Sequence, residues 1–197
     1  MDGLTEKLFG ERFPTAQDAV TEIINLEAIL RLPKGTEHFL SDLHGEYGAF
    51  CHLMNSCSGV IRAKIDELFG KLLSSSERSE LATTVYYPAE KIEAAKNSGA
   101  EMSGWYKTML YRLTLLAREC GKKYTRSKVR KAMPPRFDYI IDEMLHSAAD
   151  GGDREAYYDE IFSEIIKLGC ADTFLETIAA LIKRLAIDRL HIVGDVF

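Results

Sequence analysis

The sequence lacks several features that would indicate a membrane or an exported protein. No stretch approaches the roughly 20 consecutive apolar residues that span a bilayer, and MDGLTEKLFGERF has neither the basic start nor the apolar run of a signal peptide. No two cysteines have the two-residue spacing of a zinc knuckle or a redox dithiol; they are Cys51, Cys57, Cys120 and Cys170. We therefore expect a cytoplasmic protein with no membrane partner, whose thiols are reduced and structural.

The chain also has little net charge and no biased segment. A net charge of −5 over 197 residues gives no general attraction to nucleic acid, so no nucleic-acid partner is expected. The sequence has no internal repeat and no low-complexity linker. At this length a folded chain buries roughly 70% of the surface that its unfolded form exposes, which allows a substantial core. The length fits one domain, or one domain with a small addition.

What is present is a series of apolar stripes at helical spacing. Thr15, after Pro14, is placed to cap the first helix. Asp153 and Asp172 are predicted caps of later helices, and residues 74–79 and 96–103 are predicted surface connections. The stripes, interpreted as core positions, are Ala19, Ile23, Leu26 and Leu30; Tyr106, Met109, Leu110, Leu113 and Leu116; Phe137, Ile140, Ile141, Met144 and Leu145; Tyr158, Ile161, Ile165 and Leu168; and Phe174, Ile178, Leu181 and Leu185.

Two short apolar segments interrupt this helical pattern. Residues 37–41 (EHFLS) lead into Asp42, and residues 189–193 (RLHIV) lead into Gly194 and Asp195. Such short runs also fit helix ends, because periodicity alone does not separate the two. The flanking glycines favour strands. We predict two buried strands that each end at an acid, as at the edge of an active site.

The segment Asp42-Leu43-His44-Gly45-Glu46 carries the most chemical information. If the strand continues, Asp42 and His44 point to the same side, because side chains alternate along a strand. A carboxylate and an imidazole together suit a divalent cation such as Mn, Fe or Zn. The alternative is a solvated Asp42 that caps a turn beside a packed His44.

Gly194 and Asp195 offer a second carboxylate at the second predicted strand end. If the two strands are parallel neighbours, Asp195 can reach a metal held by Asp42 and His44, and two-metal hydrolases need such a bridging carboxylate. A Gly-Asp pair also occurs in simple turns. The separation of 195 − 44 = 151 residues far exceeds one crossover helix, which by itself counts against joining the two motifs.

A family resemblance accounts for this separation. Residues 39–65, FLSDLHGEYGAFCHLMNSCSGVIRAKI, closely resemble the N-terminal signature of the class III fructose-1,6-bisphosphatases, which belong to the calcineurin-like metallophosphoesterases. Three further segments resemble the same family: VYYPAEKIE from Val85, WYKTMLYRL from Trp105 and KYTRSKVRKAMPPRFDYIIDEML from Lys123. The resemblance covers nearly the whole chain, and the long helical insert between the two motifs is specific to this class.

The resemblance implies an enzyme that hydrolyses the 1-phosphate of fructose 1,6-bisphosphate in gluconeogenesis, with two Mn²⁺ ions as cofactors. Asp42 and His44 would hold one metal, and Asp195 would bridge both. The superfamily motif continues as G-D-x-x-D-R-G, whereas this sequence has Gly194, Asp195, Val196 and Phe197. We therefore expect a fragment that lacks the remaining catalytic residues, binds metal weakly and is inactive by itself.

On this interpretation the fold class is α/β, mostly helical, with two strands that begin a metallophosphoesterase sheet. Residues 1–60 would form a first helix, the first strand and the D-x-H loop. Residues 61–187 would form the helical insert, and residues 188–197 the second strand with the G-D motif. An exposed sheet edge at the chain's end invites pairing with another copy, so a homo-oligomer is expected.

The remaining features leave alternatives open. Residues 122–136 contain seven bases and no acid, which fits a solvated helix face or an anion site for a sugar phosphate or effector, with Lys128 and Arg130 as ligands. His52 fits a packed side chain or a supporting role at the metal, and Glu46 fits a ligand contact or a helix cap.

Alternative functions of the protein are a serine/threonine protein phosphatase, a dinucleoside polyphosphate hydrolase, or a helical interaction module.

Overall fold

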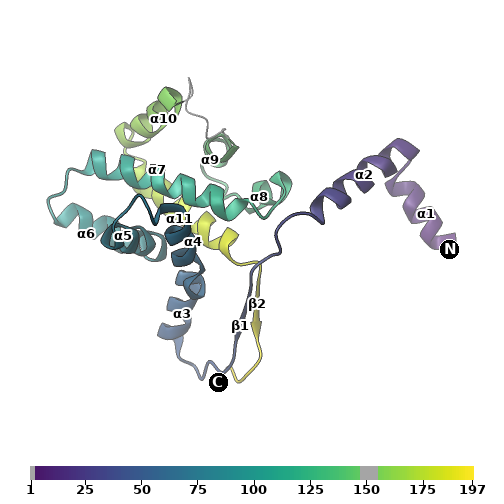
Figure 1. Cartoon of the computed structure of the whole chain (residues 1–197), viewed down its shortest axis with the longest axis horizontal. Helices are drawn as coiled ribbons and strands as arrows, with labels where there is room; N and C mark the ends of the chain where they lie inside the picture. Colours follow the sequence, from purple (N-terminus) through teal and green to yellow (C-terminus); the bar gives the residue numbers. More distant parts are fainter. Residues whose placement is uncertain (1–2, 147–154) are drawn as a thin grey trace.

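The computed structural model describes residues 3–146 and 155–197. The described chain is mostly helical, and it pairs one early strand with one late strand (Figure 1). Its elements are α1 (Gly3–Arg12), α2 (Ala16–Ile29), β1 (Glu37–Leu40), α3 (Tyr47–Ser56), the 3-10 turn η1 (Cys57–Gly59), α4 (Val60–Phe69), α5 (Ser75–Tyr86), α6 (Pro88–Asn97), α7 (Met102–Gly121), α8 (Arg126–Ala132), α9 (Asp138–His146), α10 (Glu155–Lys167), α11 (Ala171–Ala186) and β2 (Arg189–Ile192).

The body of the molecule is a group of helices packed around α7 and α11. The predicted stripe of α11 is confirmed, because Phe174, Ile178, Leu181 and Leu185 are all buried. In α7 the whole predicted stripe from Tyr106 to Leu116 is buried as well. Burying one such side chain contributes about 1.5–3 kcal/mol, so these two helices supply much of the stability of the body.

Helices α1 and α2 form an arm that projects away from this body (Figure 1). Thr15 caps α2 as predicted, in a capping box with Asp18. The stripe of α2, however, is not core: neither helix contains a buried residue, and Leu30 is 76% exposed. The spacing correctly predicted an amphipathic helix, but no element in the described part of the chain covers its apolar side.

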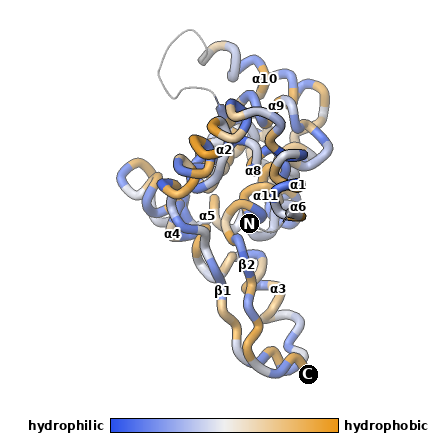
Figure 2. Tube along the Cα trace, turned by 90° about the vertical axis from the view of Figure 1, so that its right-hand side faces the viewer, coloured by the Kyte–Doolittle hydropathy of each residue, from blue (hydrophilic) through white to orange (hydrophobic). Residues whose placement is uncertain are grey.

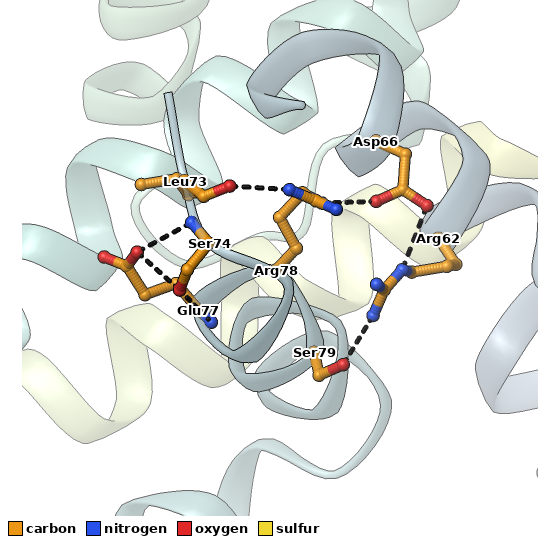
Figure 3. Close-up of polar contacts among 7 residues, drawn as sticks. All are labelled: Arg62, Asp66, Leu73, Ser74, Glu77, Arg78 and Ser79. Carbon is orange, nitrogen blue, oxygen red and sulfur yellow. Dashed lines mark hydrogen bonds and ion pairs between the residues drawn. The ribbon is translucent and has the colours of Figure 1, made fainter. Parts of the chain in front are cut away.

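Residues 74–79, predicted as a surface connection, form the cap and the start of α5 instead. Ser74 caps α5, and its hydroxyl and the Glu77 carboxylate each accept from the other's backbone N–H in a capping box. Arg78 then joins α5 to the preceding turn, because it donates to Asp66 on α4 and to the carbonyl of Leu73 (Figure 3). In the second predicted connection, only residues 98–101 lie outside α6 and α7.

The later helices differ from the prediction at their starts. Phe137 precedes α9, with a φ of 61°, and packs on Phe174 with ring centroids 5.0 Å apart. Asp153 lies outside the described residues. Asp172 does not cap α11, because Cys170 occupies the cap position. Its carboxylate instead pairs with Lys96 at 2.6 Å and accepts from the Tyr106 hydroxyl, which ties α11 to α6 and α7.

The two predicted strands form and pair in parallel, but they are not buried as expected: of their eight residues only His38 is buried, and Phe39 is 65% exposed. The register sets Glu37 opposite Arg189 and Leu40 opposite Ile192. The pair extends from the helical body together with α3, and the chain ends at its far tip (Figures 1 and 2). This arrangement is consistent with an α/β fold, although two strands alone do not define a metallophosphoesterase sheet. The division at residues 60 and 187 stays a prediction. Within the described ranges, no helix is long and apolar enough to cross a bilayer.

Candidate metal centre

The base of the strand pair is fixed to the helical body by Asp188. Its carboxylate accepts from the backbone N–H of Thr36 at 2.8 Å, and it lies 3.0 Å from Lys123 Nζ and 2.9 Å from Lys128 Nζ. Burial acts to raise the pKa of Asp188, but hydrogen bonds from Lys128, Tyr124 and Lys123 outweigh it and hold the pKa well below its usual range. Asp188 therefore sets how the start of β2 meets the start of β1.

The loops that follow the two strands stay paired beyond the sheet. The backbone N–H of Leu43 donates to the carbonyl of Asp195 at 2.6 Å, and that of Gly45 donates to Val196 at 3.2 Å. The N–H of Asp195 donates to Asp42 Oδ1 at 3.0 Å. The structure therefore brings Asp42 and Asp195 together, as the prediction of neighbouring parallel strands required.

Gly194 is necessary for this close approach. A Cβ at this position would lie 2.3 Å from Asp42 Oδ1 and 2.8 Å from the carbonyl carbon of Ser41. Neither distance is compatible with a real side chain, and the second contact is to backbone, which cannot rotate away. The glycine before the acid is thus explained by packing between the two loops.

The backbone at His44 differs from the sequence-based expectation. β1 ends at Leu40, and His44 has a φ of 46°, so residues 42–44 do not continue as a strand with alternating side chains. The turn continues through Gly45, with a φ of 66°. The imidazole Nδ1 of His44 lies 3.3 Å from the carbonyl oxygen of Phe197, on the partner loop. His44 thus reaches the second loop by a left-handed turn.

The three predicted ligands fit a divalent metal in donor type, since carboxylate oxygen and imidazole nitrogen suit Mn²⁺. They do not form a completed metal cluster: no three His, Cys, Asp or Glu side chains come together for a metal anywhere in the described ranges. Asp42 Oδ1 is also engaged by the Asp195 N–H. The roles of Asp42, His44 and Asp195 as metal ligands therefore stay predictions.

The nearby histidines differ in burial. His52 on α3 is exposed; it stacks on Tyr87 and its Nδ1 lies 2.6 Å from the Tyr87 hydroxyl, so it is not a buried side chain and its supporting role at a metal stays a prediction. His38 in β1, given no role from the sequence, is buried and its Nδ1 lies 3.0 Å from Ser58 Oγ. Burial and the charge of Lys123 lower its pKa. Glu46 occupies the cap position of α3 without a side-chain cap bond.

The two predicted phosphate ligands, Lys128 and Arg130, lie on different sides of α8 and line different hollows. Lys128 Nζ lies between Asp188 Oδ1 and the ring of Tyr124, 4.1 Å from the ring centroid. Arg130 lines a different hollow, with Arg126, Ser127 and Lys131. The contact of Lys128 with Asp188 was not predicted, because nothing in the spacing of the two residues indicates it.

All four cysteines are free thiols, as expected. Cys57 and Cys120 are buried, and burial raises the pKa of Cys57 to about 11 and that of Cys120 to about 12. Both thiols therefore stay protonated near neutral pH, which agrees with a structural role.

These features define a class: an α/β protein with acidic loops at the carboxyl end of parallel strands, the edge where such folds bind ligands. The chain belongs to the family described as Firmicute fructose-1,6-bisphosphatase, whose model matches residues 5–197. This result confirms the resemblance seen in the sequence.

Relatives named fructose-1,6-bisphosphatase class 3 are similar over nearly the whole chain. That of Porphyromonas gingivalis (strain W83) is 53% identical over 97% of this chain, and that of Clostridium acetobutylicum is 52% identical over 96%. That of Alkaliphilus metalliredigens is 52% identical over 97%. The chain spans 29% of the length of each of these relatives. No solved structure matches the chain.

Proposed function

We propose that this chain supplies the N-terminal part of the metal site of a fructose-1,6-bisphosphatase, which releases the 1-phosphate of fructose 1,6-bisphosphate in gluconeogenesis. The observation that carries the proposal is the contact of Asp42 with the backbone of Asp195, which joins the loops of two parallel strands. The names of the relatives support the substrate. They do not favour a protein phosphatase, a dinucleoside polyphosphate hydrolase or a non-catalytic module.

In this proposal Asp42, His44 and Asp195 hold Mn²⁺ together with ligands that this chain does not contain. When bound, two such ions neutralise the charge that develops on the transferred phosphoryl group. The task of this chain is positioning. Asp188 fixes the strand bases, and Gly194 lets the two loops meet, so that the Asp42 carboxylate contacts the backbone of Asp195.

A chimaera tests the proposal directly. The matching residues of the Porphyromonas gingivalis relative are replaced by this chain, and phosphate release from fructose 1,6-bisphosphate is measured with and without Mn²⁺. We expect Mn²⁺-dependent hydrolysis that falls at least about 100-fold in Asp42→Asn and Asp195→Asn, since each variant removes a charged metal ligand. A chimaera that leaves the sugar phosphate intact but cleaves a phosphopeptide would contradict the substrate assignment.

The matched control is Glu67→Gln, which neutralises an exposed carboxylate on α4, away from the strand loops. Its activity is expected to equal that of the unaltered chimaera. Metal content is measured on the same samples, so that loss of binding is separated from loss of turnover. If the Asn variants kept full metal content and activity, the ligand assignment would fail while the substrate assignment stood.

We also propose that the protein is cytoplasmic and that it self-associates through its strand pair. Phe39 and Val193, on and just after the strand pair, are 65% and 69% exposed, and within the described chain β1 and β2 pair only with each other. Such a strand pair favours association with a further copy. Light scattering on the purified chain checks this: a concentration-independent monomer mass would contradict self-association.

A further inference from the structure

Helix α8 carries two cations that the described part of the chain does not neutralise. The side chains of Arg130 and Lys131 are exposed and form no hydrogen bond or ion pair with residues 3–146 or 155–197. The other cations of residues 122–128 are engaged: Lys122 with Glu119, Lys123 and Lys128 with Asp188, and Arg126 with Asp142. Among the cations of residues 122–131, the contacts thus distinguish those paired with an acid from Arg130 and Lys131, whose charges no residue of the described ranges neutralises.

The unused cations line a hollow on the outer side of α8. Its volume is about 500 Å³, and its lining consists of Arg126, Ser127, Arg130 and Lys131. These residues form two pairs spaced by four positions, which places all of them on one side of the helix. Val129, on the other side, is buried in the core. The hollow therefore contains three cations, one hydroxyl and no acid.

A second hollow of about 260 Å³ adjoins the first and shares Lys131 with it. It also contains Arg184 and Lys128, but its lining includes the Asp188 carboxylate. Lys128 and Lys123 form ion pairs with that carboxylate. The smaller hollow therefore has less net positive charge with which to attract an anion than the larger one. The excess positive charge is concentrated on the larger hollow.

The composition of the larger hollow selects the ligand class. Guanidinium groups donate two parallel hydrogen bonds to phosphate oxygens, and an ammonium adds a mobile donor. Arg126 uses Nη2 for Asp142, at 3.1 Å, and a guanidinium has five N–H donors, so it can serve a second acceptor. Like charges at a spacing of four residues, as in Arg126 and Arg130, destabilise a helix by about 0.2–0.5 kcal/mol. A bound anion would reverse that effect.

We propose that the outer side of α8 binds a small, multiply charged phosphate compound through Arg126, Ser127, Arg130 and Lys131. The site uses side-chain donors only. It does not depend on the proposed phosphatase activity, because it is separate from the strand loops and needs no metal. Lys128, predicted from the sequence as a ligand, is outside this site because its ammonium is held by Asp188 and Tyr124.

Calorimetric titration of the purified chain with inorganic pyrophosphate, at low salt and without divalent metal, tests the proposal. We expect one site with a Kd at or below about 1 mM, which corresponds to about −4 kcal/mol. Arg130→Ala combined with Lys131→Ala is expected to weaken binding at least about ten-fold, since it removes two charge-assisted hydrogen-bonding groups. Lys128→Ala is expected to leave the affinity within about two-fold, because its ammonium is outside the site.

The matched control is the double variant Arg31→Ala and Lys34→Ala, which removes the same charges from an exposed segment outside α8. Its affinity is expected to equal that of the unaltered chain. The proposal is overturned if pyrophosphate does not bind, if the α8 double variant binds normally, or if the control loses as much affinity. Arg130→Gln with Lys131→Gln, checked by circular dichroism, repeats the test should the alanine variant unfold.

Discussion

The carboxylate of Asp42 accepts a hydrogen bond from the backbone N–H of Asp195 at 3.0 Å, although the two residues are 153 positions apart in the sequence. The bond lies beyond the ends of both strands, so it reports how well the two loops are held together. Each element that contributes to it can be tested separately.

Gly194→Ala is expected to separate the two loops, because the added Cβ would lie 2.3 Å from Asp42 Oδ1. Hydrogen exchange of the Leu43 amide, which donates to the Asp195 carbonyl, is expected to accelerate at least about ten-fold. Gly48→Ala in α3 is the control: a Cβ there meets nothing within 4 Å. Unchanged exchange at Leu43 in Gly194→Ala would show that the loops tolerate the side chain.

Asp188→Asn is expected to destabilise the chain by about 3 kcal/mol at neutral pH, because it leaves Lys123, only 8% exposed, without its charge partner. Urea unfolding followed by the fluorescence of Trp105, the single tryptophan, measures the change. Lys128→Ala is the comparison, with a loss below about 1 kcal/mol because its side chain is 60% exposed. Equal losses in the two variants would contradict this ranking.

The pH dependence of stability follows from the same carboxylate. The pKa of Asp188 is lower in the folded chain than its ordinary value of about 3.9. The folded chain therefore binds fewer protons than the unfolded chain near pH 4. Its contribution to stability is complete above about pH 5 and is lost as the pH falls below 4. Urea midpoints between pH 6 and pH 3 should fall less steeply in Asp188→Asn; parallel curves would refute the assignment.

Ser74→Ala is expected to cost about 1 kcal/mol, since it removes the hydroxyl that accepts the Glu77 N–H at the start of α5. Ser76→Ala, the second residue of the same helix, is the control, and we expect no loss of stability because alanine is the better helix former. Thermal melts of both variants give the comparison. A loss in the control as large as that in Ser74→Ala would argue against a specific capping effect.

Cys57 and Cys120 are expected to resist alkylation by iodoacetamide at pH 8, because both are buried and their pKa values are raised to about 11 and about 12. Cys51 and Cys170, which are only partly buried, are expected to react first. Mass spectrometry of digested, labelled protein distinguishes the sites. Rapid native labelling of Cys120 would show that the core around α7 opens easily.

The strands could be predicted because each is a short apolar run that stops at an acid. Their parallel pairing followed only from the assumption that both acids serve one site. The cap at Ser74 was also predictable, since Ser74 and Glu77 have capping-box spacing, but the serine-rich run was interpreted as a connection.

Other features depend on contacts that no local pattern records. Asp188 looks like an ordinary residue between a helix and a strand, yet its partners are 60 and 152 positions away. The left-handed turn at His44 is unusual for a non-glycine residue, so alternation along a strand was the natural but incorrect expectation. The apolar spacing in α2 correctly predicted a helix with one apolar side. Such spacing does not show whether the residues that pack against that side belong to the same stretch of chain.

The contact between Thr36 and Asp188 has a consequence for the order of folding. Parallel strands whose bases are 152 positions apart are expected to pair late, because closing so long a loop costs entropy while the intervening chain is unfolded. Helices α7 and α11, with the turns next to them, bring Lys123 and Asp188 together and so shorten the effective distance. We therefore expect the helical body to form first and the strands to pair in a late step of folding.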